Sequence, residues 1–124
     1  MARPSPALQV LKAEFFKALA HPVRIRILEI VRHGERSVQE LQAALELDQA
    51  TVSQQLAILR ARQVVTARKE GTTVRYAASD ARVGALLDIA RAIFSTQLSG
   101  SQSMLKELRQ ETRRPRRPRS GRSA

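Results

Sequence analysis

Apolar residues recur at spacings of three and four along the first third of the chain, which is typical of amphipathic helices. One such stripe runs through residues 8–19 and ends at His21-Pro22, because the residue before a proline avoids the helical region. A second stripe follows over residues 25–31 and closes near Gly34, a residue common just after helix ends. The pattern predicts two consecutive helices.

Two helix-start patterns follow. Ser37-Val38-Gln39-Glu40 is a capping box, in which the Ser side chain accepts from a backbone amide and the Glu reaches back. Asp48 is a good N-cap for a further helix over about 49–62, whose buried stripe would be Val52, Leu56 and Leu59. The sequence therefore predicts a short helix, a tight connection and a second helix with one polar face.

The next segment has the composition of a hairpin. Two β-prone runs, 64–69 and 73–78, flank Glu70-Gly71-Thr72. From Ser79 or Asp80 a last long helical region carries two adjacent apolar stripes, one for its own core and one for a partner. Whether this region breaks at Ser99-Gly100 is left open by the pattern.

This order of elements predicts a mainly α fold with a small β-hairpin wing, a winged helix-turn-helix. The helix from residue 49 would enter the major groove of DNA, because it exposes small polar side chains while its other side is held by a core. The expected recognition residues are Gln49, Ala50, Thr51, Ser53, Gln54 and Gln55. The hairpin would lie on the flanking backbone, with contacts from the wing residues Arg68, Lys69, Thr72, Thr73 and Arg75.

Charge favours the same partner. The chain has 22 basic and 11 acidic residues, a net charge of +11, which points to a polyanion such as double-stranded DNA. Residues 113–122 contribute six arginines, so the remainder is still basic at +5. We expect a flexible leader over 1–7, a DNA-binding and dimerisation domain over 8–111 and a disordered Arg-rich tail over 112–124. The tail would either lie along DNA phosphates or increase solubility. For the protein as a whole, the alternative function is that of a non-specific architectural or RNA-binding protein.

Composition also argues against other classes. The chain has no cysteine, which excludes disulfides, thiolate metal sites and cysteine nucleophiles. Its two histidines, His21 and His33, read as helix-end residues, and we expect neither a bound metal nor a cofactor. Gly-rich phosphate loops and catalytic clusters are missing, and so are membrane-spanning apolar runs. The sequence predicts a cytoplasmic protein that is not an enzyme.

Three segments resemble the ArsR/SmtB family of bacterial repressors, in order and spacing: FKALAHPVRIRIL at 16–28, TVSQQLAILR at 51–60 and VVTARKEG at 64–71. The resemblance implies a homodimer joined through the first and last helices, binding a near-palindromic operator in response to an unknown inducer. By the same resemblance, Thr51, Ser53, Gln54 and Gln55 are the groove contacts. The expected dimer-interface residues are Leu8, Leu11, Phe15, Leu86, Ile89, Ile93 and Phe94.

Overall fold

The computed structural model describes residues 6–98 and 102–113, and the chain divides into two compact units, with the boundary in the sequence between Val83 and Gly84. The first unit contains α1 (Pro6–Leu19), α2 (Pro22–Val31), β1 (Arg36–Ser37), α3 (Val38–Leu45), α4 (Gln49–Ala61), β2 (Val65–Glu70) and β3 (Thr73–Ala78). Helix α5 (Arg82–Gln97) starts at the boundary, and α6 (Gln102–Arg113) belongs to the second unit. The expected mainly α winged helix-turn-helix is confirmed.

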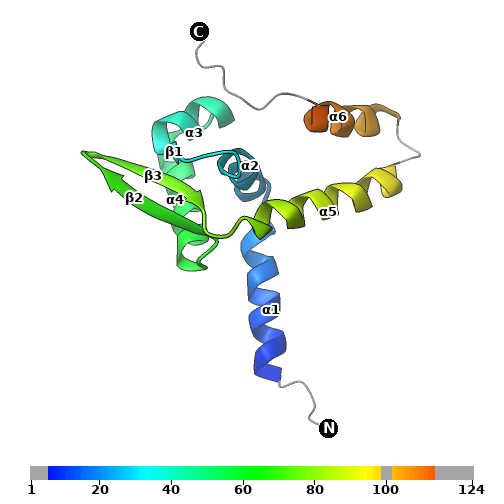
Figure 1. Cartoon of the computed structure of the whole chain (residues 1–124), viewed down its shortest axis with the longest axis horizontal. Helices are drawn as coiled ribbons and strands as arrows, with labels where there is room; N and C mark the ends of the chain where they lie inside the picture. The colour runs from blue at the N-terminus through cyan, green and yellow to red at the C-terminus, as the bar shows by residue number, and fades with distance from the viewer. Residues whose placement is uncertain (1–5, 99–101, 114–124) are drawn as a thin grey trace. The chain divides into compact units, whose positions relative to one another are not determined.

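The core formed by α2, α3 and α4 lies largely on the predicted apolar stripes, with Ile27 buried in addition, whereas most of the stripe of α1 is exposed. Helices α2, α3 and α4 pack on one another, as Figure 1 shows. They bury six large aliphatic side chains to 1% exposure or less, each contributing about 1.5–3 kcal/mol relative to an exposed position. These residues are Ile27, Leu28, Leu41, Val52, Leu56 and Leu59.

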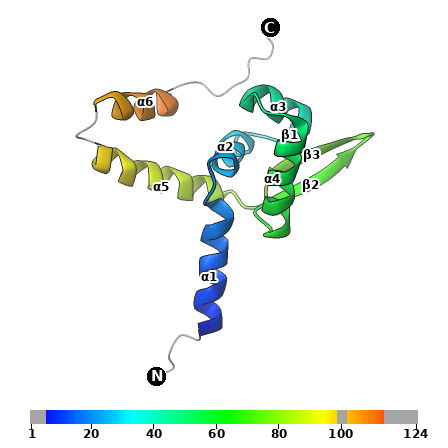
Figure 2. The ribbon, with the colours of Figure 1, turned by 180° about the vertical axis from the view of Figure 1, so that it is seen from behind.

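The wing is a three-stranded antiparallel sheet in the order β1-β3-β2. The two-residue loop Gly71-Thr72 joins Glu70 to its partner Thr73, and Gly71 alone in this loop has a positive φ, of 63°. That conformation, with Gly first, is typical of a type II′ hairpin turn. The hairpin prediction is confirmed, but β1 was missed because a two-residue strand leaves no periodic pattern. Figure 2 shows β2 beside α4.

Helix boundaries differ from expectation only at the ends. Helix α1 begins at Pro6, two residues before the first apolar position, because proline suits the first turn of a helix. His21 caps α2, its Nδ1 accepting from the amide of Val23 at 3.1 Å, so it has the helix-end role that we expected. The last helical region contains two described helices, α5 and α6, and Ser99-Gly100, where the sequence left a break open, lies outside the described residues. The predicted arginine tail lies mostly outside the described residues.

In the second unit, Arg91 of α5 links two acidic side chains. Its guanidinium lies 3.6 Å from Asp88 on the same helix and donates to Glu111 of α6 at 3.2 Å. None of the described helices is both long enough and apolar enough to cross a membrane.

Candidate nucleic-acid interface

The helix-turn-helix is held by two side-chain caps. Ser37 Oγ accepts from the amide of Glu40 at 3.1 Å, and Glu40 Oε1 accepts from the amide of Ser37 at 2.9 Å, which completes the predicted capping box. Asp48 caps α4 and accepts from the amide of Thr51 at 3.1 Å. Between the helices, Glu46 takes the left-handed conformation (φ 57°) in which helices commonly end. Both helices therefore have fixed starting points.

The predicted recognition residues fall mainly on the outer side of α4. Gln49, Ala50 and Gln54 are exposed, and Thr51 and Ser53 are half-buried. The Thr51 hydroxyl donates to Asp48 Oδ1 at 2.6 Å, and this bond lowers the pKa of Asp48. Thr51 therefore offers its oxygen as an acceptor to a ligand, with its proton already engaged.

Gln55 does not join this exposed group. At about 100° per residue it lies on the same side of α4 as Val52 and Leu59, and its exposed fraction is 9%. Its Oε1 accepts from Arg24 Nη1 at 2.9 Å. In this structure Gln55 is a buried, internally bonded residue, in contrast to the groove contact expected for it.

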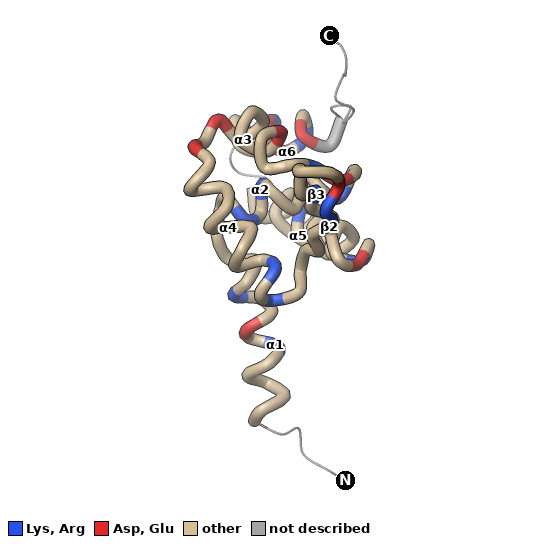
Figure 3. Tube along the Cα trace, turned by 90° about the vertical axis from the view of Figure 1, so that its left-hand side faces the viewer, with Lys and Arg blue, Asp and Glu red and all other residues tan. Residues whose placement is uncertain are grey.

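Arg24 is a residue that the sequence reasoning missed. Its Nε donates to the carbonyl of Ala18 at 2.8 Å and its Nη2 to that of Lys17 at 3.2 Å. These carbonyls lie in the last turn of α1, where backbone acceptors lack partners within the helix, although the Lys17 carbonyl also accepts from the amide of Ala20 at 3.1 Å. The guanidinium of Arg24 therefore caps the last turn of α1 and also hydrogen-bonds to the inner side of α4. Figure 3 shows the basic positions along the backbone of the first unit.

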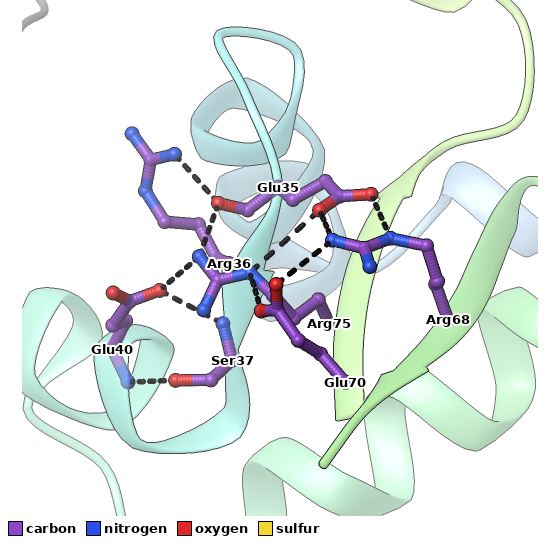
Figure 4. Close-up of polar contacts among 7 residues, drawn as sticks. All are labelled: Glu35, Arg36, Ser37, Glu40, Arg68, Glu70 and Arg75. Atoms are coloured by element: carbon purple, nitrogen blue, oxygen red, sulfur yellow. Dashed lines mark hydrogen bonds and ion pairs between the residues drawn. The ribbon is translucent and has the colours of Figure 1, made fainter. Parts of the chain in front are cut away.

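The wing residues divide into engaged and available groups. Arg68 and Arg75 both pair with acidic side chains, as Figure 4 shows. The acids concerned are Glu35, Glu40 and Glu70. Lys69 is exposed, and within the described part of the chain it forms no ion pair with them. Thr72 is exposed and Thr73 half-buried at the end of the hairpin. The available positive charge of the wing is thus concentrated at Lys69.

Glu35 is the second residue that sequence reasoning missed. Its carboxylate accepts from Arg68 Nη2 at 2.6 Å and from Arg68 Nε at 3.1 Å. These bonds, together with the charges of Arg68 and Arg75, hold the pKa of Glu35 below its ordinary value. Because 33 positions separate the two residues in the chain, no local pattern could have revealed the pair.

The predicted dimer residues occupy apolar faces in both units. On α1, Leu8, Leu11 and Phe15 are exposed, Leu11 to 67%. On α5, Leu86 is half-buried. The other predicted residues of α5 are exposed: Ile89 (60%), Ile93 (52%) and Phe94 (49%). Exposed side chains of this size favour burial against another protein surface.

Comparison with known proteins agrees with this architecture. Residues 21–66 match the family described as "Bacterial regulatory protein, arsR family". The chain is 43% identical over 106 residues to Rv0081, an uncharacterized HTH-type transcriptional regulator of Mycobacterium tuberculosis, and the match covers 85% of this chain and 93% of that protein. It is 36% identical to the biofilm growth-associated repressor of Agrobacterium fabrum, over 73% of this chain and 80% of the repressor.

Solved structures are similar over the same region. The crystal structure of Rv0081 has a TM-score of 0.71 at 44% identity and covers 78% of this chain and 97% of its own. The homodimeric winged helix-turn-helix DNA-binding domain Mb0332 of Mycobacterium bovis has a TM-score of 0.70 at 30% identity, covering 82% and 97%. With the capped helix pair, the wing and these relatives together, the chain belongs to the ArsR/SmtB family of helix-turn-helix transcriptional regulators.

Proposed function

We propose that this regulator is a repressor that binds double-stranded DNA in a sequence-specific way, as a homodimer on a near-palindromic operator. The observation that carries the proposal is the two-sidedness of α4. Its inner side chains Val52, Leu56 and Leu59 are buried to 1% or less, whereas Gln49, Ala50 and Gln54 are exposed. A helix that reads bases needs both properties, a rigid support and outward polar groups.

Each exposed side chain has a matching chemistry in the major groove. The amides of Gln49 and Gln54 both donate and accept, as bidentate bonding to adenine requires, and the methyl of Ala50 suits a thymine methyl. Thr51 and Ser53 supply hydroxyl oxygens on the same helix. On the wing, Lys69, Thr72 and Thr73 would contact backbone phosphates, which position the protein without reading sequence. Arg68 and Arg75 would first have to exchange their acidic partners.

Dimerisation would present two copies of α4 to one duplex. The exposed apolar residues of α1 and α5 are the proposed interface. The similar Mycobacterium bovis domain is described as homodimeric, which supports dimerisation as such. In two-fold helix-turn-helix dimers the recognition helices lie about 34 Å apart, one turn of B-DNA. We therefore propose half-sites about 10 base pairs apart, read in the cytoplasm by a protein without enzymatic activity.

The test is selection of bound duplexes from a random pool by the full chain, followed by titration of the selected duplex and a scrambled one. The double variant Ser53→Ala/Gln54→Ala should lose most of the preference for the selected duplex. The matched control, Ser103→Ala/Gln110→Ala, removes the same groups from exposed positions of α6 and should keep it. Equal binding of both duplexes by the unaltered chain would instead support a charge-driven architectural or RNA-binding role.

A further inference from the structure

The wing places two positive charges opposite each other, and acidic residues of the same chain offset their repulsion. Arg68 of β2 and Arg75 of β3 are direct partners in the antiparallel register. Like charges directly opposite on neighbouring strands are destabilising. Three acids from separate segments offset this repulsion: Glu35 before β1, Glu40 of α3 and Glu70 at the end of β2 (Figure 4).

The two arginines are held in different ways. Arg75 is the more enclosed, with a side chain 24% exposed, and it donates to Glu40 Oε1 at 3.2 Å and to the carbonyl of Glu35 at 3.3 Å. These bonds join β3 to the start of α3, so Arg75 belongs to the framework. Arg68 is 53% exposed; its nearest acid is Glu35, whose side chain is itself 35% exposed, and Glu70 lies 3.8 Å away. The Glu35 carboxylate also lies 3.6 Å from Arg75 Nε.

The geometry of the Arg68–Glu35 pair is that of an anion site already filled. Arg68 Nε and Nη2 both point at the Glu35 carboxylate, at 3.1 and 2.6 Å. A guanidinium uses the same two-pronged bonding for phosphate as for carboxylate. Because both side chains are open to solvent, an external phosphate can reach Arg68 and compete with Glu35.

We propose that Glu35 is an internal substitute for a DNA phosphate on Arg68, and that the duplex backbone displaces it when the wing docks. The inference rests on the proposed DNA-binding function. Each wing that docks exchanges one acceptor for another, and the displaced carboxylate stays close to the negatively charged duplex. Glu35 therefore lowers sequence-independent affinity, and it leaves discrimination to the base contacts of α4.

The test is Glu35→Gln in the full chain, titrated with a random-sequence duplex and with the selected duplex over a range of salt. We expect roughly three- to tenfold tighter binding of the random duplex at about 50 mM salt, and a salt slope steeper by up to about 0.9 per wing. Glu107→Gln is the matched control, because it makes the same charge change at an exposed position of α6 and should have a much smaller effect.

Arg68 must carry the effect. In the background Arg68→Gln, adding Glu35→Gln should change affinity no more than the Glu107→Gln control does. Unchanged or weaker random-duplex binding by Glu35→Gln would overturn the inference, and so would an equal gain from Glu107→Gln. A protein without preference for any selected duplex would contradict the proposed function alone, since the random duplex still reports on Glu35. Failure of every form to bind any duplex would overturn both.

Discussion

Arg24 Nη1 donates to Gln55 Oε1 at 2.9 Å, across 31 positions of sequence. The same guanidinium binds the carbonyls of Lys17 and Ala18, so it connects the end of α1 to the inner side of α4. A second link, between Glu14 of α1 and Arg62 at 2.9 Å, reaches the residue that follows α4. Helix α4, the proposed recognition helix, is therefore linked at two points to α1, a helix of the proposed dimer interface.

Truncation of two neighbouring glutamines should affect different properties: Gln55→Ala should reduce stability, and Gln54→Ala should reduce DNA binding. Gln55→Ala removes an acceptor from a half-buried guanidinium, and we expect it to lower the free energy of unfolding by about 1–3 kcal/mol. Gln54→Ala alters an exposed side chain and should change stability by less than about 0.5 kcal/mol, while it weakens binding to the selected duplex. Urea unfolding and DNA titration of both variants measure the contrast. If both variants lost the same small amount of free energy of unfolding, the Arg24–Gln55 bond would not contribute to stability.

The start of α5 should respond to pH through Asp80. Arg82 donates from its side chain and its amide to this carboxylate, and these bonds lower the pKa of Asp80 from 3.8 to about 2. A lowered pKa means that the stabilisation is complete above the ordinary pKa and is lost as pH falls through the folded value. Asp80→Asn can still accept from the amide but cannot ionise.

The unaltered chain should therefore exceed Asp80→Asn in stability at pH 5, and the difference should shrink steadily between about pH 4 and pH 2. Urea unfolding of both proteins at several pH values in this range measures it. A difference that stays constant down to pH 2 would show that ionisation of Asp80 does not contribute.

The apolar face of α5 can be tested through its oligomeric state. Ile93→Glu places a carboxylate on the proposed interface and should raise the dimer dissociation constant at least about tenfold, since burying an unpaired charge is costly. Gln110→Glu adds the same charge to exposed α6 as a control. Sedimentation equilibrium distinguishes them. If Ile93→Glu dimerises as well as the control does, the interface lies elsewhere.

Local patterns predicted the parts of this molecule that depend on neighbouring residues. The caps at Ser37 and Asp48 and the buried stripe of α4 follow from hydrogen-bond chemistry and helical period alone. The same period places Gln55 on the side of that stripe, but its polar amide made an outer contact look plausible. Its hydrogen-bond partner, Arg24, lies on α2, 31 positions away in the chain, so no local pattern could identify it.

The wing shows the same division. Its strands and turn were predictable from β-prone runs around Gly71, but the partners of its arginines were not. Glu35 directly precedes β1, which pairs with β3, and β1 is too short to leave a sequence pattern that would predict this placement. Arg68 and Arg75, which look available in the sequence, are therefore paired with acids in the fold, whereas Lys69 is not.

The most direct measurement is a footprint of the full chain on its selected duplex, alongside Ser53→Ala/Gln54→Ala. We expect two protected patches about 10 base pairs apart, related by the symmetry of the site, and their loss in the double variant at the same protein concentration. Protection that spreads evenly over any duplex, or two patches that the double variant retains, would contradict the reading of bases by α4.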